Sequence, residues 1–193
     1  TGANGKCLIE NSESGYIKTV TDADSGKPYE LLILDEAHSA RVSKDFSGSS
    51  KKTQIYAMLE RVSGKIPHMI LATATPMQKE AGEYHSLLKL LGLPKAWQKA
   101  PVYMKSLDLI SCSEYPSLTD LSSAAKMLSM TMEGMKPSTD RLNEEQDRVL
   151  KRVIELKDGD ITILTDYVRD NWSTIRQLLV LLHPAHLLTV RNT

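Results

Sequence analysis

The sequence has 193 residues, a length that suits one domain with a sizeable hydrophobic core. Its 24 basic and 24 acidic side chains balance, so no overall positive field attracts nucleic acid, and any DNA-binding face must be local. Two distant cysteines follow no metal or redox spacing, and no apolar run reaches the roughly 18 residues of a membrane span. We therefore expect a cytoplasmic protein with no membrane partner.

Residues 1–28 are rich in Gly, Ser, Asn and Asp, which predicts a loop-rich segment with one or two short strands. Thr1–Lys6 resembles part of a phosphate-binding loop, but the pattern also needs an earlier glycine and a Ser or Thr where Cys7 stands. A simple turn is the better interpretation. Because the chain starts with Thr1 and not Met, we expect it to be a fragment of a longer protein.

The next segment predicts a strand that ends in two carboxylates. Residues 31–34 are all aliphatic, which is typical of a parallel strand buried on both faces, and Asp35 and Glu36 follow at once. Ligands of open α/β sheets bind at the carboxyl ends of such strands. One carboxylate there can hold Mg²⁺ through water, and its neighbour can orient or deprotonate an attacking water.

A second strand and two helices follow. Residues 43–52 look like a mobile loop whose lysines either face DNA or a partner, or are simply solvated, and we favour solvation. Residues 52–63 have helical apolar spacing, residues 67–72 form another apolar run that leads into Thr73, and residues 78–91 predict a second helix. This alternation indicates a right-handed parallel α/β unit over residues 29–93.

From residue 94 to residue 185 the pattern becomes helical, which predicts a mainly helical insertion. Asp140 and Asn171 are candidate N-caps within it. Met127, Met130, Met132 and Met135 offer either an adaptable partner-binding surface or core filler, and core filler is the interpretation we favour. His183 and His186 have no metal-ligand partner at suitable spacing, so they fit the end of a helix better than a metal site. Residues 186–193 predict a returning strand.

Three motifs together resemble bacterial Swi/Snf-type ATPases of helicase superfamily two, in particular the branch that recycles RNA polymerase. Asp35-Glu36-Ala37-His38 resembles the DEAH form of Walker B, and residues 73–78 (Thr-Ala-Thr-Pro-Met-Gln) resemble the family's motif III. Residues 190–193 (Val-Arg-Asn-Thr) resemble the motif that ends the first motor lobe. The resemblance implies an α/β fold: a partial RecA-like lobe of the P-loop NTPase type, with parallel strands and a mainly helical insertion.

The resemblance also implies roles for individual residues. Asp35 would hold Mg²⁺ through water, Glu36 would activate water for ATP hydrolysis, and His38 would link this site to motif III. Candidate residues for coupling ATP state to nucleic acid are Arg41, Thr73, Thr75, Gln78 and Arg191. The parent protein would move along double-stranded DNA in the bacterial cytoplasm, with a second RecA-like lobe and a transcription, repair or defence complex as partners.

Two other functions remain open. A DEAH-type helicase would unwind DNA or RNA, although Thr-Pro-Met-Gln after the Thr-Ala-Thr core argues against it. A degenerate lobe could serve as a non-catalytic scaffold, although the intact Asp35 and Glu36 argue against that. Because the sequence contains no credible phosphate loop and no second lobe, we expect this chain alone to bind ATP poorly and to hydrolyse it negligibly.

Overall fold

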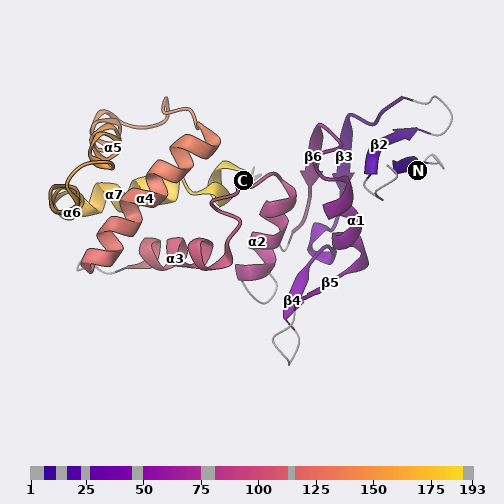
Figure 1. The fold of residues 1–193 in the computed structure, drawn as a ribbon, viewed down its shortest axis with the longest axis horizontal. Coiled ribbons are helices and arrows are strands. Elements are labelled where there is room, and N and C mark those ends of the chain that lie inside the picture. Colours follow the sequence, from indigo (N-terminus) through magenta and orange to yellow (C-terminus); the bar gives the residue numbers. More distant parts are fainter. Residues whose placement is uncertain are drawn as a thin grey trace. The chain divides into compact units, whose positions relative to one another are not determined.

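The computed structural model describes residues 7–11, 17–22, 27–44, 50–74, 81–112 and 116–188. The chain divides into two compact units, Thr1–Leu93 and Pro94–Thr193. In Figure 1 the first unit is coloured from indigo to magenta and contains every strand that the structure describes, whereas the described residues of the second unit, which ends in yellow, form helices. The fold is therefore mixed α/β with a small parallel sheet.

The first unit contains three pairs of strands. Strands β3 (Leu31–Leu34) and β6 (His68–Leu71) run parallel, with Leu31 opposite His68 and Leu34 opposite Leu71. The expected parallel pair is confirmed. The two antiparallel pairs are β1 (Cys7–Asn11) with β2 (Ile17–Asp22), and β4 (Val42–Lys44) with β5 (Ser50–Lys52). The second antiparallel pair lies where the sequence suggested only a loop.

Two helices and a short 3₁₀ turn complete this unit: η1 (Ala37–Ser39), α1 (Gln54–Val62) and α2 (Ala81–Leu90). Helix α1 begins at Thr53, whose hydroxyl accepts a hydrogen bond from the backbone N–H of Tyr56 at 3.2 Å. The apolar residues of α1 repeat at helical spacing, so Tyr56, Leu59 and Val62 face the core. The core also contains Ala40, Ile66, Leu87 and Leu90, with Leu32, Leu34, Met69 and Leu71 of the sheet packed against it.

The parallel sheet is covered on one face only, which corrects the expectation that its strands are buried on both faces. Leu32 and Leu34 point into the core, whereas Ile33, the residue between them, is 62% exposed. Its neighbour across the strands, Ile70, is 49% exposed. The side chains alternate because successive residues of a strand face opposite sides. An apolar strip therefore lies open on the outer face of β3 and β6.

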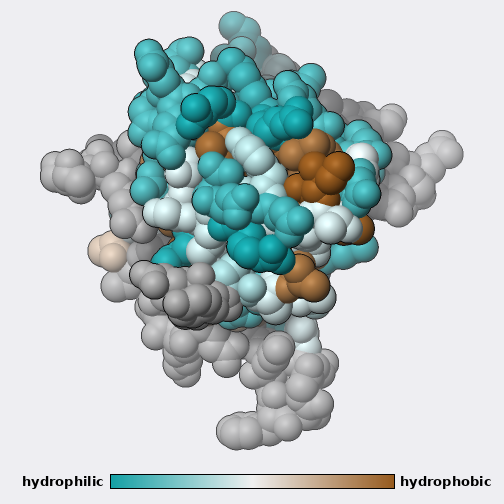
Figure 2. Space-filling view, turned by 90° about the vertical axis from the view of Figure 1, so that its left-hand side faces the viewer, coloured by the Kyte–Doolittle hydropathy of each residue, from teal (hydrophilic) through white to brown (hydrophobic). Residues whose placement is uncertain are grey.

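The second unit consists of helices: α3 (Ala100–Ser111), α4 (Leu118–Met135), α5 (Glu144–Leu156), α6 (Ile161–Asp170), α7 (Trp172–Leu181) and α8 (Pro184–Leu187). Its interior is formed by apolar side chains from α3 to α7, together with Trp97, which precedes α3. Figure 2 looks onto this unit and shows a mostly hydrophilic surface with a few apolar side chains, some of which adjoin one another. The exposed apolar residues of α6 are Ile161 and Ile163. None of the described helices is long and apolar enough to span a bilayer.

Helix caps correct two sequence expectations. Helix α5 is capped by Asn143, in a capping box with Gln146, and not by Asp140. Asn171 precedes α7, but its side chain donates to the carbonyl of Tyr167 at 2.8 Å and caps no N–H of α7. Asn143 satisfies the first turn of α5 because it lies three residues before Gln146, the spacing that a capping box requires.

The expected returning strand is wrong for its first residues, because His186 and Leu187 belong to α8. Pro184 occupies the first turn of that helix, where its missing N–H has no cost and its fixed φ suits the helical backbone. Arg191 and the rest of the Val-Arg-Asn-Thr motif lie outside the described residues.

Candidate functional site

Two parallel strand ends bring the DEAH segment and Thr73 together. The Ala72 N–H donates to the Leu34 carbonyl at 2.8 Å, and the Ala37 N–H donates to the Ala72 carbonyl at 2.9 Å. These two bonds extend the pairing of β3 and β6 past the regular strands. They fix the turn after β3 against the segment after β6. Sequence reasoning did not single out Ala37 and Ala72, whose contribution is through backbone atoms alone.

Asp35 and Glu36 form a sharp turn at the end of β3. Glu36 has a left-handed backbone, with φ 52° and ψ 46°, and it precedes η1. For a residue other than glycine this conformation costs about 1–2 kcal/mol. Oδ1 of Asp35 accepts a hydrogen bond from the Glu36 N–H at 2.8 Å, which helps to hold the turn. Strain of this kind persists where the surroundings enforce it, and it is frequent at functional sites.

His38 connects the acidic turn to the second strand end. Its Nδ1 lies 3.0 Å from Oε2 of Glu36 and 3.3 Å from Oγ1 of Thr73. An ionised carboxylate can only accept, so the Glu36 contact requires a proton on Nδ1 of His38. The structure thus brings together three of the residues that the sequence predicted, and a single imidazole nitrogen contacts the other two.

The carboxylates are open to solvent, whereas the turn beneath them is anchored. The Glu36 side chain is 65% exposed and Asp35 is also exposed. Ala37 and Ala40 are fully buried, which holds η1 against the core. The two carboxylates can therefore face a ligand without losing their position.

This donor set suits magnesium bound together with a nucleotide. Mg²⁺ keeps several waters and is usually held by one or two carboxylates plus substrate phosphates, so it needs no cage of protein ligands. In the part of the chain that the structure describes, no three His, Cys, Asp or Glu side chains cluster as a metal site. Oδ2 of Asp35 makes no hydrogen bond to any described residue, and one open carboxylate oxygen fits a water-mediated contact to Mg²⁺.

Arg41 lies next to the start of α1. The backbone N–H of Arg41 donates to Oγ1 of Thr53 at 3.3 Å, and the backbone carbonyl of Arg41 accepts from the Thr53 N–H at 3.1 Å. These bonds attach the segment after η1 to the N-cap of α1. The other predicted coupling residues, Thr75 and Gln78, lie outside the described residues, as does the Thr1–Lys6 segment.

A second polar cluster is buried in the helical unit around His183. Its Nε2 lies 2.8 Å from Oγ of Ser106, and its Nδ1 accepts from the Ala185 N–H at 3.2 Å. The Ser106 hydroxyl donates to the carbonyl of Tyr103 at 2.5 Å, so the proton between serine and histidine belongs to Nε2. His183 is therefore neutral and begins α8, and it is not a metal ligand.

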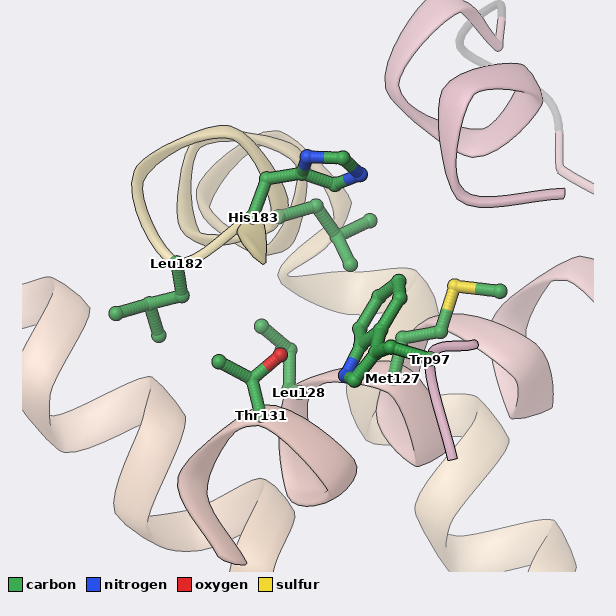
Figure 3. A pocket seen from close by; sticks show the side chains of 7 residues that line it. Trp97, Met127, Leu128, Thr131, Leu182 and His183 are labelled. Carbon is green, nitrogen blue, oxygen red and sulfur yellow. The ribbon is translucent and has the colours of Figure 1, made fainter. Parts of the chain in front are cut away.

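The surroundings of His183 are dry. The aromatic ring of Trp97 meets the imidazole edge-on, with ring centroids 5.7 Å apart. Figure 3 shows these two side chains together with Met127, Leu128, Thr131 and Leu182, and the space between them has no room for a water molecule. Burial, with a smaller contribution from the nearby His186, lowers the pKa of His183 to about 4.

Comparison with known proteins gives two kinds of match. The SNF2-related domain matches residues 12–158. RNA polymerase-associated protein RapA from two strains of Vibrio vulnificus, YJ016 and CMCP6, is similar to this chain, with 27% identity over 127 residues in each case. The match covers 66% of this chain and 12% of each relative, so the chain spans a small part of their length. No solved structure matches significantly.

Proposed function

The chain belongs to the SNF2-related domain family of helicase-like ATPases, and we propose that it forms part of the first RecA-like lobe of a DNA translocase. The parent protein would couple ATP hydrolysis to movement along double-stranded DNA. The observation that carries this proposal is the contact of one His38 nitrogen with both Glu36 and Thr73, across the ends of β3 and β6.

In the proposed mechanism each acidic residue has its own role. Asp35 would hold the water shell of Mg²⁺ through its open oxygen, and charge on the ATP phosphates would be neutralised there when the metal is bound. Glu36 orients the attacking water and accepts its proton. An exposed carboxylate can act as this base, because the anchored backbone of the turn fixes its position relative to the water.

His38 is a positioning residue in this proposal. Its Nδ1–H stabilises the ionised Glu36 and also reaches the Thr73 hydroxyl, so a movement of the segment after β6 alters the environment of the carboxylate. Thr75, Gln78, Arg41 and Arg191 are proposed to extend this coupling toward DNA and the second lobe.

The remaining proposals concern the parts around the site. Residues 29–93 would supply the RecA-like core, residues 94–185 a helical insertion and residues 186–193 the return to the lobe. The similarity to RNA polymerase-associated protein RapA supports a transcription complex as the partner, in the bacterial cytoplasm. Since the proposed site also needs a phosphate loop and a second lobe, the isolated chain is expected to hydrolyse ATP negligibly.

The test is ATP hydrolysis by the full-length parent, with and without double-stranded DNA. Glu36→Gln should lower DNA-stimulated turnover by at least ~10²-fold, the usual contribution of a positioned base. Glu30→Gln is the matched control, because it removes an exposed carboxylate at the opposite end of the same strand. Full turnover by Glu36→Gln, or an equal loss in both variants, would show that Glu36 has no role in hydrolysis.

A further inference from the structure

An open groove lies between α3 and α4 in the helical unit. It holds about 270 Å³, and its apolar lining comes from Pro101 and Val102 on α3 and from Met127 and Met130 on α4. Met127 is 5% exposed and lies at the bottom, whereas Val102 and Met130 are half-buried and Pro101 is exposed. Ser123, whose hydroxyl donates to the Thr119 carbonyl at 2.6 Å, is a small residue on the α4 side.

The size of the groove favours a peptide over a small molecule. Pockets for drug-sized ligands measure about 300–1,000 Å³ and enclose most of the ligand, whereas this groove is smaller and open. Its volume suits one or two apolar side chains that enter from a segment lying along the surface. Methionine adapts to such side chains because it is unbranched and polarizable.

Two lysines frame this apolar floor, and only one has an ionic partner. Nζ of Lys105 lies 2.5 Å from Oδ1 of Asp120, so its charge is matched. Lys126 is exposed on α4 and forms no ion pair with any residue in the described ranges. The groove therefore combines an apolar floor with one uncompensated positive charge, four residues before Met130 on the same helix face.

We propose that this groove binds an acidic amphipathic segment of a partner protein, with apolar side chains against Val102, Met127 and Met130 and a carboxylate at Lys126. DNA fits the groove poorly, because phosphate backbones are bound by several cations and make little use of an apolar floor. The methionines of α4 thus include both core filler and partner-binding surface, the two roles that the sequence left open. Met127 belongs to the core and borders the groove, and Met130 contributes to its surface.

The test uses the 193-residue chain and a fluorescein-labelled peptide of about 12 residues, near the length below which isolated helices are only marginally stable. The peptide carries two leucines one helical turn apart and three glutamates, and binding is followed by fluorescence anisotropy. We expect saturable binding, and we expect Lys126→Glu to weaken it at least ~5-fold, more at low salt than at high salt. Met130→Glu should weaken it further, because it places a carboxylate beside the apolar floor.

Arg148→Glu is the matched control. Arg148 is exposed on α5, and its replacement by Glu makes the same charge reversal outside the groove. Binding should therefore change less than ~2-fold. Far-UV circular dichroism of every variant checks that the helices persist. Equal weakening by Lys126→Glu and Arg148→Glu, equal binding of a scrambled peptide, or tighter binding of duplex DNA that the peptide cannot displace would each overturn the proposal. These measurements need no ATP, so their failure is distinct from failure of the proposed ATPase.

Discussion

Nδ1 of His38 lies 3.3 Å from the hydroxyl oxygen of Thr73, although 35 positions separate the two residues in the chain. The contact exists because β3 and β6 are parallel neighbours that end at the same edge. A hydrogen bond between two strand ends lets the position of one end influence the other.

We predict that His38 and Thr73 act together in the parent protein. His38→Ala and Thr73→Ala should each reduce DNA-stimulated ATP turnover, and the double variant should lose less than the product of the two effects, because each single change already breaks the contact. A double-mutant cycle on turnover with and without DNA measures this coupling. Independent, multiplicative losses would contradict it, and Ser39→Ala, next to His38 in η1, serves as the control.

Glu36→Gly should stabilise the first unit while it abolishes the proposed activity. Glycine adopts φ 52° without a Cβ penalty, so relief of about 1–2 kcal/mol outweighs the added freedom of the unfolded chain. Amide hydrogen exchange of β3 and β6 measures the gain. Glu36→Ala is the control, because it removes the carboxylate but keeps the strain. Equal exchange rates in the two variants would argue against strain at this turn.

The helical unit should lose stability as the pH falls from about 6.5 to about 4. The pKa of His183 is lowered to about 4 in the folded protein, so within this window the unfolded chain binds a proton that the folded protein does not. The shift corresponds to a loss on the order of 3 kcal/mol. Urea unfolding followed by tryptophan fluorescence reports on this unit, because Trp97 and Trp172 are the chain's two tryptophans and both belong to it.

The control for this pH dependence is His183→Gln, which does not titrate. The variant should be less stable than the unsubstituted chain at pH 7, because it loses the Ser106 contact or the Ala185 contact. Its free energy of unfolding should also change less with pH. An unchanged slope between pH 6.5 and pH 4 would assign the effect to other groups. Asp120, whose pKa is lowered to about 2 by Lys105 and Ser117, titrates below this window.

Asn143→Ala should destabilise the helical unit by about 1 kcal/mol, because it removes the side-chain oxygen that accepts from the Gln146 backbone N–H at the start of α5. Asp140→Ala should cost less than about 0.5 kcal/mol, since Ser138 is the only described residue to which the Asp140 side chain is hydrogen-bonded. Urea titration of both variants gives the comparison. A larger loss for Asp140→Ala would mean that α5 begins earlier than the structure places it.

The sequence was informative wherever one local pattern determined the outcome. Residues 31–34 and 69–72 are uninterrupted apolar runs, and they mark the parallel pair of β3 and β6. The α5 cap was also readable, because Gln146 follows Asn143 at capping-box spacing, although the prediction chose Asp140. Strand β5 was missed because Ser50, Lys51 and Lys52 have no apolar alternation, although their backbone pairs with β4.

The contacts that define the candidate site could be predicted only in part. The order of the motifs suggested that His38 meets the segment after β6, but no pattern indicates the left-handed backbone of Glu36. The Ser106–His183 contact joins residues 77 positions apart through the packing of α3 beside α7. Such contacts depend on how whole helices pack, which the periodicity of one helix does not specify.

The uncovered face of β3 and β6 has a practical consequence for anyone who handles this chain in solution. Ile33 and Ile70 lie side by side on it, and the outer edges of β3 and β6 pair with no other strand that the structure describes. Apolar strips beside open edges promote aggregation between copies, and a charged residue in the strip is a common remedy. We expect the chain to self-associate as its concentration rises, and Ile33→Lys to keep it monodisperse without disturbing the inner face that holds Leu32 and Leu34.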